Sequence, residues 1–289
     1  MKKQLLFKMG VCLACASSLL TACTKNNQGA DTKANPKTAI SADVAQKIKN
    51  LGFSADNVRK MGGNYIVEGD IMLTPANLNE ASTASPVLRI AETEQYQTHN
   101  LVKNLPRTIT VSVSNLPTVY ATATANAVAR YNALNLTLKF QVVSSGGNMV
   151  ITGFNEGVDS DGFITLGYSG FPTAAGNPYN AIGMNTNADA YGSNPDVGYL
   201  TSVIQHEMGH CIGMRHTDYF NRNLSCGTGG GGNEGSTYSS SDPQDYPGAI
   251  HIPGTPTTTF DAGSWMLACS SGTDRTFNAN DKIALNYLY

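Results

Sequence analysis

Three histidines and a glutamate between residues 206 and 216 have the types and the spacing needed for metal chemistry. The segment reads His-Glu-Met-Gly-His-Cys-Ile-Gly-Met-Arg-His and contains three of the chain's five histidines. His206 and His210 are four residues apart, so on a helix both side chains would project from one face and could bind one metal ion. Gly213 can take the left-handed conformation that ends a helix, and the resulting turn would bring His216 back as a third ligand.

Glu207 lies next to the first histidine, displaced from the axis of the ligand side chains. We therefore predict that it is the general base, acting on a water bound to the metal, rather than a ligand. Three neutral imidazoles leave one tetrahedral position open, which is the donor set typical of a catalytic zinc site. The alternative is an ordinary solvated helix face, but a glutamate and a glycine correctly placed among three histidines argue against it.

The pattern resembles the signature of the metzincin zinc endopeptidases, H-E-x-x-H-x-x-G-x-x-H followed by a tight turn that contains methionine. Ser264-Trp265-Met266 would supply the turn, and Met266 would form a hydrophobic floor beneath the zinc ligands. Plain core packing is the alternative role for Met266. Residues 252–256 and 280–289 look more narrowly like the bacterial HEIGH-type metallopeptidases, the M57 group. The resemblance covers roughly residues 105–289 and implies a metzincin-like catalytic domain.

The activity that this resemblance implies is zinc-dependent endopeptidase cleavage of protein or peptide substrates, with Glu207 activating the attacking water. Two alternatives stay open. One is a lipid-anchored binding protein with a structural zinc site, and the other is a zinc hydrolase of a non-protein substrate. Glu207 favours an enzyme, because a structural zinc site requires no base.

Four other acidic residues have roles that the sequence leaves open. Asp218, two residues beyond His216, could accept a hydrogen bond from a ligand imidazole or could cap a short turn. Glu234 follows a glycine-rich run, and we interpret it as a loop acid rather than a metal ligand. Asp159 and Asp161 could bind a structural calcium ion, which the sequence leaves open.

The N-terminus has the pattern of an export signal. Lysines flank a short apolar run that is too short to span a membrane, and the run ends in Leu20-Thr21-Ala22-Cys23. This ending resembles the lipobox of bacterial lipoproteins, which predicts that residues 1–22 are removed and that Cys23 is lipidated. A plain secretory signal is the alternative. We expect an exported protein, anchored by lipid to the outer membrane or the cell surface of the bacterial envelope.

Composition agrees with an exported globular enzyme. The chain has 289 residues, of which 41% are hydrophobic and 14% charged, with a net charge of −2, so nothing favours a nucleic-acid partner. We expect a monomer that meets the membrane only through its lipid. Of the cysteines outside the signal and lipid site, Cys211 follows a ligand histidine on the predicted helix and should pack inward. We therefore predict a Cys226–Cys269 disulfide, although the sequence does not fix the pairing.

The chain divides into a tether, a small N-terminal block and a catalytic domain. Residues 23–38 are polar and predict a flexible tether. Residues 39–105 would form a small domain or a pro-segment with a linker, and Asp70 or Glu68 could then bind the metal to keep the enzyme latent. Residues 106–289 would form the catalytic domain.

Hydrophobic patterning within residues 106–289 predicts an α+β fold. We expect strands at residues 108–113, 136–142, 149–154, 163–166 and 181–185, a helix at residues 119–134, and a zinc-binding helix capped by Asn194-Pro195. The resemblance implies a twisted, mostly parallel sheet with an edge strand. Substrate would lie extended beside that edge, which we expect near residues 181–185.

Overall fold

The computed structural model describes residues 40–79, 95–159, 162–227, 234, 249–256 and 260–289. The predicted signal peptide, the lipidation site Cys23 and the tether lie outside the described residues, as does Asp161 of the suggested calcium pair. In the part of the chain that is described, no helix has the length and apolar character needed to cross a bilayer.

Residues 40–79 form a small block with a core of its own. Helix α1 (Ala42–Asn50) begins after Ser41, whose hydroxyl accepts a hydrogen bond from the Val44 amide at 3.3 Å. Strands β1 (Arg59–Met61), β2 (Asn64–Val67) and β3 (Ile71–Leu73) form an antiparallel sheet, followed by a short 3-10 helix, η1 (Asn77–Asn79). The buried core residues are Ile48, Phe53, Val58, Val67, Ile71, Leu73 and Leu78. The block belongs to the same compact unit as the rest of the described chain.

A five-stranded sheet organises residues 107–185. It consists of β5 (Arg107–Val113), β6 (Leu138–Val142), β7 (Met149–Phe154), β8 (Gly167–Tyr168) and β9 (Ala181–Asn185). The strand order is β6-β5-β7-β9-β8, and all pairs are parallel except β8 with β9. The predicted fold class, α+β with a mostly parallel sheet, an edge strand and an active-site helix, is confirmed.

The edge strand is not where the sequence placed it. Strand β9 lies between β7 and β8, and its last four residues are buried, so the segment predicted to be the edge is an internal strand. The edges of the sheet are β6 and β8. The strand predicted at residues 163–166 is wrong, because this segment is irregular and β8 begins directly after it. Gly183 of β9 permits its pairing with β8, because a Cβ there would lie 2.2 Å from the Tyr168 ring.

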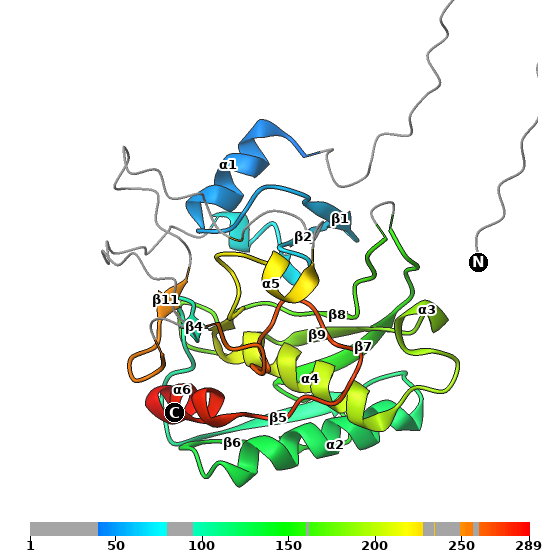
Figure 1. Cartoon of the computed structure of the whole chain (residues 1–289), viewed down its shortest axis with the longest axis vertical. Helices are drawn as coiled ribbons and strands as arrows, with labels where there is room; N and C mark the ends of the chain where they lie inside the picture. Colours follow the sequence, from blue (N-terminus) through cyan, green and yellow to red (C-terminus); the bar gives the residue numbers. More distant parts are fainter. Residues whose placement is uncertain (1–39, 80–94, 160–161, 228–233, 235–248, 257–259) are drawn as a thin grey trace, which may run out of the picture. The chain divides into compact units, whose positions relative to one another are not determined.

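Two long helices pack against the sheet and against each other, α2 (Thr118–Ala133) and α4 (Val197–Ile212), as Figure 1 shows. They share a buried cluster with the sheet that includes Ile109, Val111, Tyr131, Ile151, Met184, Ile204 and Met208. Asp196 caps α4, accepting a hydrogen bond from the Tyr199 amide at 2.7 Å. The predicted cap at Asn194-Pro195 is therefore wrong, because a carboxylate one residue further on reaches the free amides of the first turn.

Shorter elements complete the described chain. Strands β10 (Met214–Arg215), β4 (Tyr96–Gln97) and β11 (Ile250–His251) form a second small sheet in that order. Helices α3 (Ala188–Tyr191) and α5 (Asn223–Cys226) are single turns. The C-terminal helix α6 (Ala279–Leu288) starts with a capping box between Asn278 and Asp281.

Candidate metal centre

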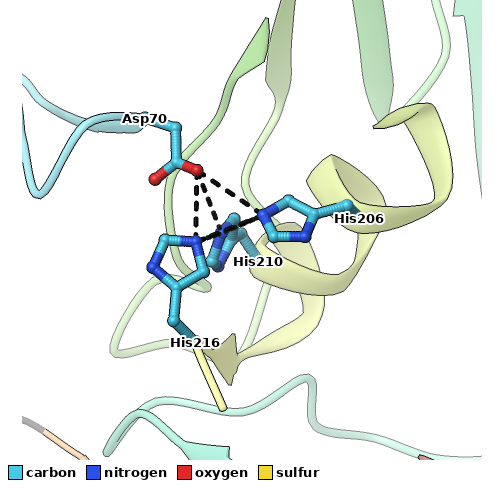
Figure 2. Close-up of side chains that lie close together, drawn as sticks. All are labelled: Asp70, His206, His210 and His216. Atoms are coloured by element: carbon cyan, nitrogen blue, oxygen red, sulfur yellow. Dashed lines mark hydrogen bonds and ion pairs between the residues drawn. The ribbon is translucent and has the colours of Figure 1, made fainter. Parts of the chain in front are cut away.

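Three imidazoles converge at the end of helix α4. His206 and His210 project from one face of the helix, and Gly213 ends it in the left-handed conformation at φ 113°. Strand β10 then returns the chain, so that His216 faces the other two rings (Figure 2). The Nε2 atoms lie 3.0 Å apart for His206 and His210, and 3.2 Å apart for each of the other two pairs. The structure thus brings together all three predicted ligands.

The opposite nitrogens of these rings show that the centre fits a metal. His206 Nδ1 lies 3.0 Å from the Trp265 carbonyl oxygen, and His210 Nδ1 lies 2.8 Å from the Met214 carbonyl oxygen. A carbonyl only accepts, so each Nδ1 carries its ring's hydrogen and each Nε2 presents a lone pair. Burial and the neighbouring His206 hold the pKa of His210 well below its usual value, which keeps this ring neutral. Lone pairs facing each other at this distance need a cation between them, and imidazoles with an open position suit zinc.

Asp70 occupies the remaining side of the centre. Its Oδ2 atom lies 3.1 Å from His216 Nε2, 3.5 Å from His206 Nε2 and 4.0 Å from His210 Nε2 (Figure 2). Burial alone would raise the pKa of Asp70, but the facing histidines outweigh it and lower the pKa well below its usual value. The four side chains could together hold one metal ion. The carboxylate comes from the turn between β2 and β3, in the N-terminal block.

Glu207 lies beside the three histidines, against the edge strand. It is 2% exposed, and its Oε2 accepts a hydrogen bond of 2.7 Å from the Ser169 hydroxyl. Burial raises the pKa of Glu207 well above its usual value, and the Asp70 carboxylate adds to that shift. A Cβ at Gly167 would lie 2.8 Å from Glu207 Oε1, so the edge strand makes room for this carboxylate.

The turn that contains Met266 supports the helix from below. Met266 is fully buried, and a Cβ at Gly209 of α4 would lie 2.7 Å from its sulfur. Asp281 holds the turn, accepting hydrogen bonds from the Ser264 hydroxyl at 3.0 Å and the Trp265 amide at 3.3 Å. The same turn presents the Trp265 carbonyl to His206, so Asp281 positions a ligand through the backbone.

The model of the family described as dual-action HEIGH metallo-peptidase matches residues 65–289. The chain belongs to this family. It is a zinc metallopeptidase, as the resemblance in its sequence predicted, with Met208 standing in the position of the isoleucine in H-E-I-G-H.

Solved structures similar to this HEIGH metallopeptidase include myroilysin, at 14% identity over 67% of this chain and 98% of that chain, with a TM-score of 0.40. Another is high choriolytic enzyme 1, a hatching enzyme zinc-protease from Oryzias latipes (medaka fish), at 14% identity over 63% of this chain and 88% of that chain, with a TM-score of 0.35. No curated protein matches the chain.

Glu234 lies behind the metal centre of this metallopeptidase. Among the described residues it is not one of the side chains that converge on the metal position, as predicted, but it contacts the ligand His216, which the sequence did not indicate. It is 3% exposed, and its Oε1 lies 2.5 Å from His216 Nδ1. Burial opposes the charge on Glu234, but His216, Arg222 and Arg215 outweigh it and lower the pKa of Glu234. Arg215 and Arg222 lie on either side of His216 in the sequence, but only the fold shows that both are held near a buried acid.

Asp218 has a different part from either of the two suggested by the sequence. Its carboxylate accepts hydrogen bonds from the Ala268 amide at 2.9 Å and the Ser225 hydroxyl at 2.5 Å. Within the described residues, it makes no hydrogen bond to a ligand imidazole. Asp218 therefore ties the segment after His216 to the segment after Met266.

A disulfide joins the same two segments. Cys226 and Cys269 are bonded, with their Cα atoms 5.1 Å apart, and Cys211 is buried and free. The disulfide lies along a cavity of about 630 Å³ that also reaches His206, Glu207 and Asp70. Asp159, suggested for calcium, accepts a hydrogen bond from the Phe163 amide at 3.0 Å, and a calcium site stays a prediction.

Proposed function

We propose that this metallopeptidase is an endopeptidase in which His206, His210 and His216 hold zinc and Glu207 is the general base. The observation that carries the proposal is the convergence of three Nε2 atoms beside a buried glutamate. Bound zinc would supply a Lewis acid that lowers the pKa of water and polarises a peptide carbonyl.

The chain's own residues divide the remaining work. Carbonyl oxygens behind His206 and His210, and the Glu234 carboxylate behind His216, fix which ring nitrogen faces the metal. Ser169 holds one oxygen of Glu207. The other oxygen can take a proton from the attacking water and pass it to the leaving amine, a role that its raised pKa favours.

The N-terminal block is proposed to be an inhibitory pro-segment. Asp70 faces the side of the centre that a substrate carbonyl would need. The same segment forms a parallel β-bridge with the chain just after β8. The Ser169 amide donates to the Asp70 carbonyl at 3.0 Å, and the Met72 amide donates to the Ser169 carbonyl at 2.6 Å. A strand added to a sheet edge is a common mode of peptide binding, so the block excludes substrate from that edge.

A chain that can be cut on demand tests the activity. The full-length protein carries a site for a specific protease within residues 80–94, which lie inside the linker predicted from Asn79 to Pro106, and is cut after it has folded and bound zinc. We expect the cut chain to cleave quenched peptides, a zinc chelator to stop it, and Glu207→Gln to lower kcat by at least about a hundredfold at equal zinc content. Cleavage that persists in Glu207→Gln would refute the assignment of the base.

Latency is tested in the uncut chain. Asp70→Ala should raise the residual peptide cleavage of the uncut protein, because the metal centre loses the carboxylate that fills its open side. Asp43→Ala is the matched control, since Asp43 is an exposed acid of the same block that pairs with Lys47 on α1 and is not one of the described residues that converge on the metal centre. Equal residual activity in both variants would argue that residues 40–79 are not an Asp70-dependent inhibitor.

Export and lipid anchoring through Cys23 are also proposed, on the lipobox-like ending of the N-terminal apolar run. Expression in a bacterium with a radiolabelled fatty acid should label the wild type and not Cys23→Ala, and the variant should leave the membrane fraction. A monomeric state and a membrane contact limited to the lipid stay predictions.

A further inference from the structure

A second carboxylate of the N-terminal block is buried against an arginine beside the metal centre. Glu68 Oε2 lies 2.7 Å from Arg215 Nη2, and both side chains are 1% exposed. Arg215 directly precedes the ligand His216. Its guanidinium lies over the rings of Phe53, at 4.8 Å, and Phe171, at 5.7 Å.

The backbone conformation at Glu68 and Gly69 points the carboxylates of Glu68 and Asp70 at two different partners. Glu68 has a φ of 52° and Gly69 a φ of 93°. A positive φ is unfavourable for a glutamate and persists where surrounding contacts enforce it. The turn places Asp70 on the metal side and Glu68 on Arg215, so one short stretch of chain occupies two neighbouring positions of the site.

The surroundings of Arg215 are incomplete without Glu68. Arg215 Nη1 is buried and has no hydrogen-bond partner, and Glu234 Oε2 lies 3.7 Å from Nη2, beyond hydrogen-bond range. The other oxygen of Glu234, Oε1, contacts His216 Nδ1 and lies 3.5 Å from Arg222 Nε. Arg215 and Arg222 carry two positive charges, and Glu234 and Glu68 carry two negative charges. Loss of Glu68 therefore leaves one positive charge uncompensated.

Departure of residues 40–79 would remove Glu68 and Phe53 together. What remains is a guanidinium beside the Phe171 ring, which itself packs edge-on against the ligand His210 at 5.5 Å. A desolvated guanidinium with free donors binds a carboxylate far better than a neutral amide, because the bond is charge-assisted. This is the chemistry of a side-chain recognition site rather than of a structural core.

We propose that Arg215 lies at the bottom of a substrate subsite that selects an aspartate or glutamate side chain near the scissile bond. Glu68 occupies this subsite in the uncut chain in place of the substrate's acid. The proposal rests on the proposed endopeptidase activity and on the inhibitory role of residues 40–79. It makes Arg215 a specificity-determining residue rather than a catalytic one.

The test uses the full-length chain with a cleavable site in residues 80–94, folded, loaded with zinc and then cut. Paired quenched peptides differ only by Glu or Gln at one position, for each position around the cleaved bond. At one position, we expect kcat/KM to favour Glu by about tenfold or more, the scale of one charge-assisted hydrogen bond. Arg215→Gln should abolish that preference by lowering kcat/KM for the Glu peptides while leaving kcat/KM for the Gln peptides unchanged. Arg215→Lys should retain part of the preference.

A binding measurement separates failure of the subsite from failure of the proposed activity. Labelled Glu and Gln peptides are titrated into the cut chain carrying Glu207→Gln, and anisotropy reports their affinity. Cleavage with no Glu preference at any position would overturn the subsite and leave the endopeptidase intact. If the wild type cleaves no peptide, the proposed endopeptidase activity is refuted, and the binding measurement then tests the subsite by itself. Equal affinity for the Glu and Gln peptides in that measurement would overturn the subsite. If Arg215→Gln does not fold, the wild-type comparison and Arg215→Lys decide.

Discussion

Replacing Glu234 measures how much the carboxylate behind His216 supports the metal. Its Oε1 lies 2.5 Å from His216 Nδ1, and both side chains are 1% exposed, so water does not screen the contact. Loss of such a partner typically lowers metal affinity by about 10- to 100-fold, or about 1.4 to 2.7 kcal/mol. Glutamine keeps an acceptor for the Nδ1 hydrogen and loses only the charge. We therefore expect about a tenfold loss in Glu234→Gln and nearer a hundredfold loss in Glu234→Ala.

The assay is competition for zinc between the uncut full-length protein and a chromogenic chelator of known affinity. Thermal unfolding of the metal-free proteins, followed by circular dichroism, checks that each variant has folded. Glu156→Gln is the matched control, because Glu156 also pairs with an arginine, Arg59, at 2.8 Å but contacts no ligand histidine. Its zinc affinity should equal that of the wild type.

A single result would refute this reasoning. If Glu234→Gln and Glu234→Ala both bind zinc within about twofold of the wild type, the short contact with His216 does not support the metal. Glu234 would then serve only to neutralise Arg215 and Arg222. In that case, its loss should lower the stability of the metal-free protein while the zinc affinity of the folded fraction stays the same.

Three further predictions concern the supports of the centre. Gly209→Ala would place a Cβ 2.3 Å from Trp265 Cη2, so we expect a loss of about 1–3 kcal/mol in unfolding free energy, measured by urea titration; an unchanged midpoint would contradict the packing. Cys269→Ser removes the disulfide that joins Cys226 and Cys269 across 43 residues, which should lower the unfolding free energy by about 2–4 kcal/mol under oxidising conditions. A reductant should lower the unfolding free energy of the wild type to the same value. Burial raises the pKa of Asp281 to about 7. Because this exceeds the value of about 3.9 in an unfolded chain, the folded state keeps a proton that the unfolded state loses. Stability relative to Asp281→Asn should therefore fall by up to about 1.4 kcal/mol per pH unit as pH rises from about 4 to about 7 in metal-free protein; a difference that does not change with pH would argue against a buried neutral acid.

The metal ligands were predictable because their geometry is local. One helix turn relates His206 to His210, and one left-handed glycine brings back His216, so spacing alone carries the information. The base, Glu207, belongs to the same short segment. The turn at Met266 was predicted from the family resemblance, because no hydrophobic periodicity distinguishes it from other loops.

The supporting acids were not predictable, because their partners are distant in sequence. Glu234 reaches His216 across 18 residues that include a glycine-rich run with no periodic pattern. Asp281 looks like an ordinary helix cap, and only the folded chain shows that it also holds the turn that faces His206. The edge strand was missed for a different reason. Strand β8 has two residues, too few for an alternating pattern, and the prediction at Ala181–Asn185 came from the resemblance, in which the edge strand precedes the active-site helix.

The pairing of Met72 with Ser169 bears on how the protein behaves in concentrated solution. An open sheet edge presents free amide and carbonyl groups that can pair with the edge of another molecule. In the intact chain, backbone hydrogen bonds with the N-terminal block occupy this edge just after β8. If the block departs as proposed, this edge is free to pair with another molecule as well as with substrate. Removal of residues 40–79 would then also promote self-association of the enzyme, and peptides bound along the edge should oppose it.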